Sequence, residues 1–568
     1  MNNDIEQLCI ELKEMVSIYR TDKFLGDMTS SISVPKFALS QGLLSPLREI
    51  LYLCNLHLTS SLPEGEEQPM YSQEAWEEMI SKISEIQSWY QNNVFKDPPK
   101  SAHDYQLKII SLQSFLNYFN QGPLNYPEQI LERLERYFKS FASFIEKSVG
   151  IRLEVLIDIT QYLMGVPNRF LDKYMNSRNG ELSFRDFAIE MKTKKILPPD
   201  WEKHMPERIK MQMKFQHDAG LINTFSKGEL NDLFDAEDVD KFLRLFLVER
   251  KQTDFLFYSQ KNQMLNKTIF QRSDGDYQFF KRELLPLNTF NTLQDLLTSD
   301  NSKREKYFKQ RGIELEKKVA EIFIRHFGEK LEYYESYYTE KGNEQDLIFF
   351  YENICLIVEV KSSKLKEPRR DPEKAYDLIK SNFDEVIDKA YEQTFRVKEY
   401  FLDNVDFEIY EDKALKKSLK NVQTKRYPHH FSIIVTLERF GGIQCDLSQM
   451  LDLYDGDTFP WSATIDDIES FLLVLKKEKV NNKKLCLKDF LYIRQRMHSK
   501  ISTDDESDII GAYLKGKLTI KSQFKDKRIF PLGDMEIFDE HYQKKGGIGF
   551  ENEIDIEKKN SEHNIVLG

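Results

Sequence analysis

Two apolar runs between Asn343 and Ser363 contain three charged side chains. The runs, LIFFY and CLIVEVKS, have the length and the branched and aromatic composition of neighbouring central strands. Alternate side chains of a strand share a face, so Glu359 and Lys361 project together, and a hairpin would bring Asp346 beside Glu359. Two carboxylates in a partly dry site repel each other unless a cation compensates them. Oxygen ligands of this kind predict magnesium, with manganese as the alternative.

A third carboxylate is expected from a helix predicted over residues 311–328. At 100° per residue, the apolar side chains of this helix form one arc. Glu316 falls on the arc between two phenylalanines, whereas Glu314 and Glu321 lie on the polar side. A carboxylate that points toward the interior needs a partner there. His326 falls on the same arc, so position alone does not single out Glu316.

The order of these residues resembles the PD-(D/E)XK nuclease superfamily. The matching positions are a helix glutamate, an aspartate and a Glu-x-Lys on an apolar strand: Glu316, Asp346, Glu359 and Lys361. The next helix carries Ala390 and Gln393, which are similar to the A-x-x-Q element of many members. Gln345 replaces the family's proline, and Val397 replaces the tyrosine of the related Q-x-x-x-Y element, which argues against a RecB-like assignment. The resemblance covers roughly residues 301–440.

The resemblance implies a metal-dependent phosphodiesterase with an α/β restriction endonuclease-like core, a mixed sheet flanked by helices. The implied catalytic residues are Glu316, Asp346, Glu359, Lys361 and Gln393. The implied ligands of Mg²⁺ are Asp346, Glu359, the Val360 carbonyl and Glu316. Lys361 would orient or help deprotonate the attacking water, and Gln393 would contact the phosphate or orient a ligand. An endonuclease is expected, with DNA favoured over RNA and prokaryotic restriction or anti-phage defence as the setting.

Two other interpretations use the same residues. A structural salt bridge of Lys361 with Glu359 or Asp346 needs no metal, but it leaves the other carboxylate uncompensated. A catalytically inactive nuclease-fold module would bind nucleic acid or a protein partner, yet such a module has no need of buried like charges. For Gln393, a place on the helix surface at the edge of an apolar stripe is as well supported as a place in the site.

Two basic segments are candidates for phosphate contacts. The first, SSKLKEPRRDPEK, follows the strand of Lys361 and includes Arg369 and Arg370, which are the predicted nucleic-acid-binding residues. The second runs from Lys413 to Arg426. A solvated charged face accounts for either segment equally well.

Two patterns are set aside. GAYLKGKL, residues 511–518, has the glycine and lysine spacing of a phosphate-binding loop but ends in leucine where a metal-binding hydroxyl is required, so no ATP site is expected. His429 and His430 lack partners at zinc-ligand spacing, and a loop pair at a strand entrance is the preferred interpretation.

Composition places the chain among soluble, multidomain proteins. It has 568 residues, 40% hydrophobic and 31% charged, and no apolar run of membrane-spanning length. Five scattered cysteines and the absence of a visible signal sequence predict a cytoplasmic protein. The net charge of −12 confines any nucleic-acid contact to a local surface.

The hydrophobic pattern predicts four regions. Residues 1–176 read as a helical domain, which is expected to serve recognition, regulation or homo-oligomerisation, and residues 177–300 as a helical or α+β connection. Residues 301–515 are expected to form the nuclease-like domain with a helical extension, and residues 516–568 a polar tail.

Overall fold

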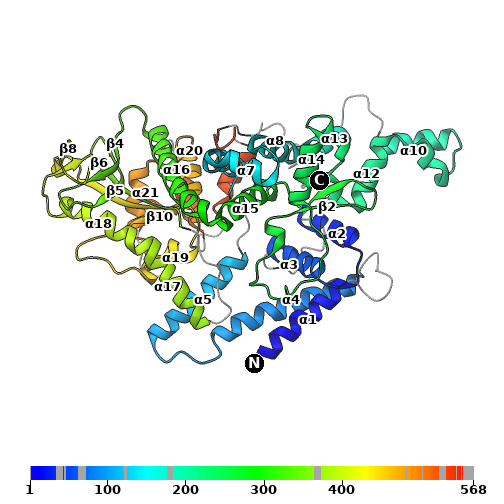
Figure 1. The fold of residues 1–568 in the computed structure, drawn as a ribbon, viewed down its shortest axis with the longest axis horizontal. Coiled ribbons are helices and arrows are strands. Elements are labelled where there is room, and N and C mark those ends of the chain that lie inside the picture. Colours follow the sequence, from blue (N-terminus) through cyan, green and yellow to red (C-terminus); the bar gives the residue numbers. More distant parts are fainter. Residues whose placement is uncertain are drawn as a thin grey trace. The chain divides into compact units, whose positions relative to one another are not determined.

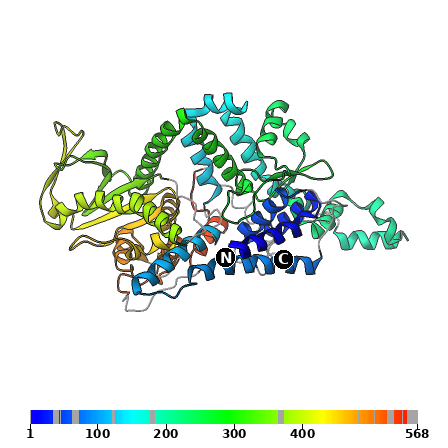
Figure 2. The ribbon, with the colours of Figure 1, turned by 60° about the horizontal axis from the view of Figure 1, so that its bottom comes forward.

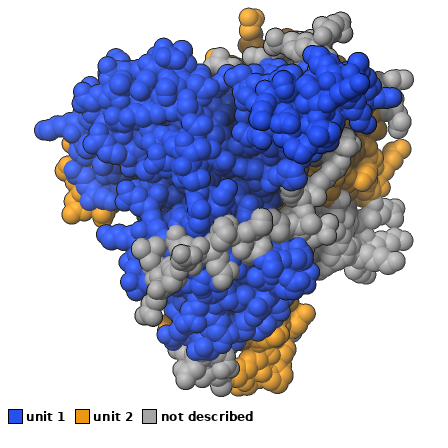
Figure 3. All heavy atoms as spheres, turned by 90° about the vertical axis from the view of Figure 1, so that its right-hand side faces the viewer, with its two compact units in different colours: residues 1–89, 120–300, 554–568 blue, residues 90–119, 301–553 orange. Residues whose placement is uncertain are grey.

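The chain divides into two compact units. The computed structural model describes residues 2–33, 43, 46–61, 72–120, 125–175, 183–363, 372–480, 483–501, 503, 505–522, 533–544, 546–551 and 553. Unit 1 comprises Met1–Trp89, Asn120–Asp300 and Ile554–Gly568. Unit 2 comprises Tyr90–Phe119 and Asn301–Glu553 (Figure 3).

The N-terminal region is helical, as the sequence predicts. Its helices are α1 (Asn2–Ser17), α2 (Thr21–Ser33), α3 (Pro46–Leu58), α4 (Gln73–Val94), α5 (Ala102–Asn120), α6 (Pro127–Phe138), α7 (Ala142–Val149), α8 (Leu153–Met164) and α9 (Val166–Phe170). The sequence of α8 is apolar on most sides, and eight of its twelve residues are buried. Helix α6 is instead amphipathic and buries one side.

The rest of unit 1 combines helices with a small sheet. The helices are α10 (Phe184–Thr193), α11 (Trp201–His204), α12 (Glu207–His217), α13 (Lys227–Asn231), α14 (Ala236–Phe246) and α15 (Leu284–Ser299). Strands β1 (Thr224–Phe225), β2 (Ile269–Gln271) and β3 (Tyr277–Phe279) form an antiparallel sheet in the order β1-β3-β2. The Asp235 side chain caps α14 by accepting a hydrogen bond from the Glu237 N–H.

Unit 2 is built on a seven-stranded mixed sheet in the order β10-β9-β6-β5-β4-β7-β8. The strands are β4 (Glu332–Tyr338), β5 (Glu344–Tyr351), β6 (Ile354–Lys361), β7 (Phe407–Tyr410), β8 (Ser418–Val422), β9 (His429–Thr436) and β10 (Trp461–Thr464). Strands β4, β5 and β6 form an antiparallel meander, whereas β9 is parallel to β6 and β10 is parallel to β9. The parallel pair β6 and β9 requires a crossover, which the intervening helices supply.

Helices cover both faces of this sheet (Figures 1 and 2). On one face, α18 (Lys389–Leu402) packs against β6 and β9. It continues α17 (Pro372–Phe383) through a π-helical segment, Asp384–Asp388. On the other face, α16 (Asn301–Phe327) packs against β5 and β6, with the Phe323 ring stacked 4.9 Å from that of Phe349. Burial of β5 and β6 on both faces explains why they read as continuous apolar runs.

Several elements predicted from the sequence are confirmed. The helix expected at 311–328 is the C-terminal part of α16, and the strands expected from LIFFY and CLIVEVKS are β5 and β6. The chain therefore has an N-terminal helical region followed by a mixed sheet flanked by helices. Among the residues that the structure describes, no helix is long and apolar enough to cross a membrane.

Helices also complete the C-terminal part of unit 2. They are α19 (Gly442–Cys445), α20 (Ile465–Leu475), α21 (Leu487–Gln495), α22 (Glu506–Leu514) and α23 (Glu536–Gln543), and a two-stranded ladder pairs β11 (Lys479–Val480) with β12 (Lys483–Lys484). Helix α23 lies within the expected polar tail. It is nevertheless folded, because it buries Ile537, Phe538 and Tyr542 and packs against α20 and α22.

The packing of α22 depends on a glycine. A Cβ atom on Gly511 would lie 2.2 Å from the Asp534 carbonyl oxygen and 2.5 Å from its carbonyl carbon. We therefore expect Gly511→Ala to lower the free energy of unfolding by about 1–3 kcal/mol in urea denaturation followed by circular dichroism. Gly312→Ala in α16 is the matched control, since its Cβ would meet only the Ser362 hydroxyl at 3.6 Å. Equal effects of the two substitutions would contradict this account.

Candidate active site

The β5–β6 register places two carboxylates opposite each other. The last pair of this ladder is Leu347 with Val358, and Asp346 and Glu359 are the residues directly beyond it on the two strands. The two residues are joined through their backbones and side chains. The Asp346 N–H donates to Glu359 Oε1 at 3.2 Å, and the Val360 N–H donates to Asp346 Oδ2 at 2.7 Å. The hairpin predicted from the sequence thus brings both carboxylates to one end of the two strands.

Lys361 lies between these carboxylates. Its ammonium group donates a hydrogen bond to Glu359 Oε2 at 3.1 Å and lies 3.8 Å from Asp346 Oδ2. The Glu359 side chain is 1% exposed, while those of Asp346 and Lys361 are 19% and 18% exposed. The group is therefore open to solvent only on the side of Asp346 and Lys361.

Gln393 on α18 completes this contact. Its Oε1 accepts a hydrogen bond from the Lys361 ammonium at 2.8 Å. The interaction forms because α18 covers the face of the sheet that carries Ile357, Glu359 and Lys361. Val397 of the same helix packs in the apolar cluster on this face. The structure thus brings together Asp346, Glu359, Lys361 and Gln393, whose amide holds the ammonium group rather than pointing to bulk solvent.

Glu316 approaches the carboxylate end of the sheet from α16. Burial, and then the negative charge of Asp346, raise its pKa to about 7, while Lys361 opposes this shift. Glu335 and Glu344 raise the pKa further. No hydrogen bond or salt bridge reaches the Glu316 carboxylate from the described part of the chain. His326, the other polar group of the same arc, bonds the Leu472 carbonyl instead.

Glu359 is the most strongly perturbed carboxyl of the set. Complete burial and the neighbouring charge of Asp346 raise its pKa well above 4.5, against the opposing effect of Lys361. One ammonium group thus contacts two carboxyl groups, those of Asp346 and Glu359, while the Glu316 carboxyl interacts electrostatically with Asp346 and Lys361. Perturbed carboxyls that gather at one end of a sheet are typical of functional sites.

The sequence did not indicate Tyr337 of β4. This residue is fully buried in the apolar cluster between the sheet and α18, and its hydroxyl has no hydrogen-bond partner among the described residues. Burial, followed by the charge of Glu359, raises its pKa. The preceding residue, Ser336, has a φ of 48° and interrupts the ladder opposite Asp346. Only this distortion, which leaves no mark on the sequence pattern, turns Tyr337 toward that cluster.

The donor set fits a hard divalent cation in chemistry and charge. Asp346 and Glu359 offer carboxylate oxygens on adjacent strands. A bound cation would offset the electrostatic repulsion between the carboxylates. Lys361 supplies the compensating charge in the structure as it stands. Within the described residues, no three His, Cys, Asp or Glu side chains are grouped closely enough to form a ready-made metal site.

Of the two basic segments, only Lys413–Arg426 lies entirely within the described residues. Arg369 and Arg370 lie outside the described residues. In the segment Lys413–Arg426, Lys417 pairs with Glu411 at 2.7 Å and Lys420 with Glu332 at 2.6 Å. The solvated-face interpretation accounts for Lys417, whose side chain is 64% exposed, whereas the Lys420 side chain is only 15% exposed and packs over the Phe350 ring.

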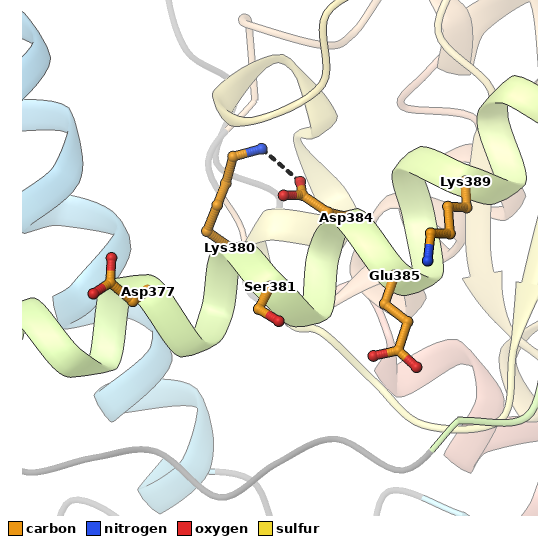
Figure 4. A pocket seen from close by; sticks show the side chains of 6 residues that line it. All are labelled: Asp377, Lys380, Ser381, Asp384, Glu385 and Lys389. Atoms are coloured by element: carbon orange, nitrogen blue, oxygen red, sulfur yellow. Dashed lines mark hydrogen bonds and ion pairs between the residues drawn. The ribbon is translucent and has the colours of Figure 1, made fainter.

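A hollow lies along α17, the π-helical segment and the start of α18 (Figure 4). It is lined by Asp377, Lys380, Ser381, Asp384, Glu385 and Lys389. All six belong to one continuous helical segment, and Lys380 pairs with Asp384 at 2.5 Å. None of the residues of the carboxylate group lines this hollow, so it is a separate feature.

The patterns set aside in the sequence have structural roles. GAYLKGKL begins inside α22, where Gly511 allows a close helix contact. His429 bonds the Tyr492 hydroxyl at 2.7 Å, and the His430 ring stacks on Phe401.

Comparisons with known proteins provide no family for the chain. No protein-family model, curated protein or solved structure matches it. The site therefore has to be interpreted from its own geometry.

Burial of the Glu359 carboxyl should make the stability of the fold depend on pH. Its raised pKa means that the unfolded chain releases this proton at a lower pH than the folded chain does. Stability should therefore fall as the pH rises above about 4.5 toward the raised pKa. We expect metal-free Glu359→Gln to gain in unfolding midpoint relative to wild type across that interval, measured by thermal denaturation at several pH values.

Glu329→Gln is the matched control, because Glu329 is an exposed glutamate of the same unit. It should follow the wild-type pH profile. A Glu359→Gln profile parallel to that of wild type would show that the carboxyl is not strained by burial.

Proposed function

We propose that the chain is a metal-dependent nuclease that hydrolyses phosphodiester bonds. The observation that carries the proposal is the group of Asp346, Glu359 and Lys361 at one end of a rigid strand pair, with two carboxylates directly opposed. Like charges buried at this depth destabilise a folded protein. Their presence therefore indicates that the site serves a purpose other than stability. Binding a divalent cation and a phosphate is the use that fits all three charges.

The order of elements supports the same conclusion. Helix α16, the meander β4-β5-β6, the helices α17 and α18, and the parallel strand β9 follow the arrangement expected of a restriction endonuclease-like core. In that arrangement the helix glutamate, the strand carboxylates and the lysine meet at one sheet end. The preference for DNA over RNA, endonuclease action and a role in prokaryotic restriction or anti-phage defence rest on the resemblance.

The metal would be held by Asp346, Glu359 and the Val360 carbonyl, with Glu316 as the further carboxylate. Mg²⁺ or Mn²⁺ bound there would act as a Lewis acid toward the scissile phosphate. Lys361 would orient the attacking water and offset the negative charge that develops in the transition state. Gln393 would hold the ammonium group in place, since its Oε1 accepts a hydrogen bond from Lys361.

A catalytically inactive module that binds nucleic acid or protein is the second candidate. The contacts of Lys361 with both Asp346 and Glu359 favour it, because an internal ion pair partly compensates the carboxylates without metal. That pair leaves Glu316 uncompensated, with a pKa of about 7. The nuclease proposal accounts for all three carboxyl groups.

Cleavage assays test the proposal directly. We expect wild-type protein with Mg²⁺ or Mn²⁺ to cleave plasmid or single-stranded DNA, and Asp346→Ala and Lys361→Ala each to lower the rate by about 10² or more. Lys330→Ala, which changes an exposed lysine in the turn after α16, should retain wild-type activity. Undiminished cleavage by both site variants would assign the activity to another site or a contaminant.

Metal binding should also release protons. Glu359 and Glu316 have raised pKa values without metal, and a divalent cation binds the deprotonated carboxylates. At pH 7 we expect about one proton or more to be released per ion, so the calorimetric binding enthalpy should change with the ionisation enthalpy of the buffer. Asp346→Ala should abolish this heat. A buffer-independent enthalpy would contradict the assignment of these carboxyls as ligands.

A further inference from the structure

We infer that the N-terminal arm of α16, Asn301–Gln310, binds the phosphate backbone of a single-stranded nucleic-acid segment that leads to the candidate active site. This inference deepens the proposed function and rests on it. It concerns recognition of the strand rather than hydrolysis.

The arm extends beyond the carboxylate end of the sheet. Phe327 packs on Tyr351 with ring centroids 4.7 Å apart, near the far end of β5, whereas Glu316 lies near Asp346. Arg311 marks the sheet end, since its buried guanidinium group donates to the Ser362 carbonyl directly after β6. The ten residues before Arg311 add about 15 Å of helix at 1.5 Å per residue. This length therefore projects past the site.

The composition of the arm differs from that of the chain. Four cationic side chains and one carboxylate give it a net charge of +3, in a chain with −12 overall. They are Lys303, Arg304, Lys306, Lys309 and Glu305. Arg304, Lys306 and Lys309 are exposed. A local cluster of cations in an acidic protein is the kind of surface that binds phosphates.

Lys309 has the position best suited to a flanking phosphate. It precedes Glu316 by seven residues, so both side chains lie on one stripe of the helix, about 10 Å apart along the axis. Lys309 makes no hydrogen bond or salt bridge within the part of the chain that the structure describes. Its ammonium group is therefore available to a ligand.

An aromatic ring on the arm indicates a strand with accessible bases. Phe308 is 37% exposed, and the Arg311 guanidinium carbon lies 4.9 Å from its ring centroid. Cations interleaved with exposed aromatic rings are typical of surfaces that bind single strands, because bases stack on the rings while phosphates meet the cations.

The other side of the site is unfavourable for a phosphate backbone. Glu335 of β4 and Glu344 of β5 raise the pKa of Glu316 through their negative charge, and Glu340 lies in the turn between these strands. A polyanion is repelled there and attracted to the arm. The charge distribution therefore selects one of the two directions by which a strand could leave the site.

Binding of a fluorescently labelled 20-nucleotide single strand to the full chain tests the inference. Titrations followed by anisotropy in EDTA, at several salt concentrations, measure recognition without hydrolysis. We expect Lys309→Glu to weaken binding and to lower the slope of log affinity against log salt by about one unit. Phe308→Ala should weaken it about fivefold or more. Lys330→Glu is the matched control, with the same charge change at an exposed lysine in the turn that follows α16.

The outcomes separate this inference from the proposed function. If Lys309→Glu and Lys330→Glu weaken strand binding equally, or if neither weakens it, the assignment of the arm is overturned. This holds whether or not the protein cleaves DNA. Equal competition by polyglutamate also overturns it, as does tighter binding of the duplex of the same sequence. Failure of wild type to cleave DNA with metal bears on the proposed function alone. Circular dichroism checks that the variants fold.

Discussion

The direct opposition of Asp346 and Glu359 across the β5–β6 ladder is the constraint on which unit 2 depends. Both strands are buried on both faces, so the two carboxylates lie at the end of an otherwise apolar strand pair. Hydrogen bonds from the Asp346 and Val360 amides hold the two carboxylates in place. The remaining elements compensate this pair: Lys361 by charge, Gln393 by holding Lys361, and α16 by closing the end of the sheet.

Two other buried ion pairs in unit 2 show the contrast. The Arg494 guanidinium bonds both carboxylate oxygens of Glu506, and the Trp461 indole donates to Glu506 Oε1 at 2.9 Å. Lys398 pairs with the buried Asp457 at 2.5 Å, and Thr458 accepts a further hydrogen bond from it. In each of these two pairs, one carboxylate is matched by one cationic group and by a further hydrogen bond. The Lys361 ammonium group is instead shared by the carboxyls of Asp346 and Glu359, and the nearby Glu316 carboxyl has no hydrogen bond or ion pair within the described residues, so these carboxyls are incompletely compensated.

Helix α16 contributes to the core, to the candidate site and to the proposed recognition surface. Its apolar arc packs on the sheet, Glu316 joins the carboxylate group, and its N-terminal arm is cationic. Arg311 ties the helix to the residue that follows β6, so the arm keeps a defined position relative to the site. A recognition surface and a reactive centre on one rigid helix would need no separate hinge to act together.

The sequence by itself determined the strands β5 and β6, the helix α16 and the meeting of Asp346, Glu359 and Lys361, because two-residue and 3.6-residue periodicities are local properties. It indicated that Glu316 faces the interior but not that Asp346 would raise its pKa. Only the tertiary structure decided that Gln393 reaches Lys361, that Tyr337 turns toward the buried cluster beside Glu359, and that residues near 540 fold as a helix. These outcomes depend on how α18 and α23 pack and on a single left-handed residue, Ser336. Contacts between elements distant in the chain leave no periodic signal, and the structure alone resolves them.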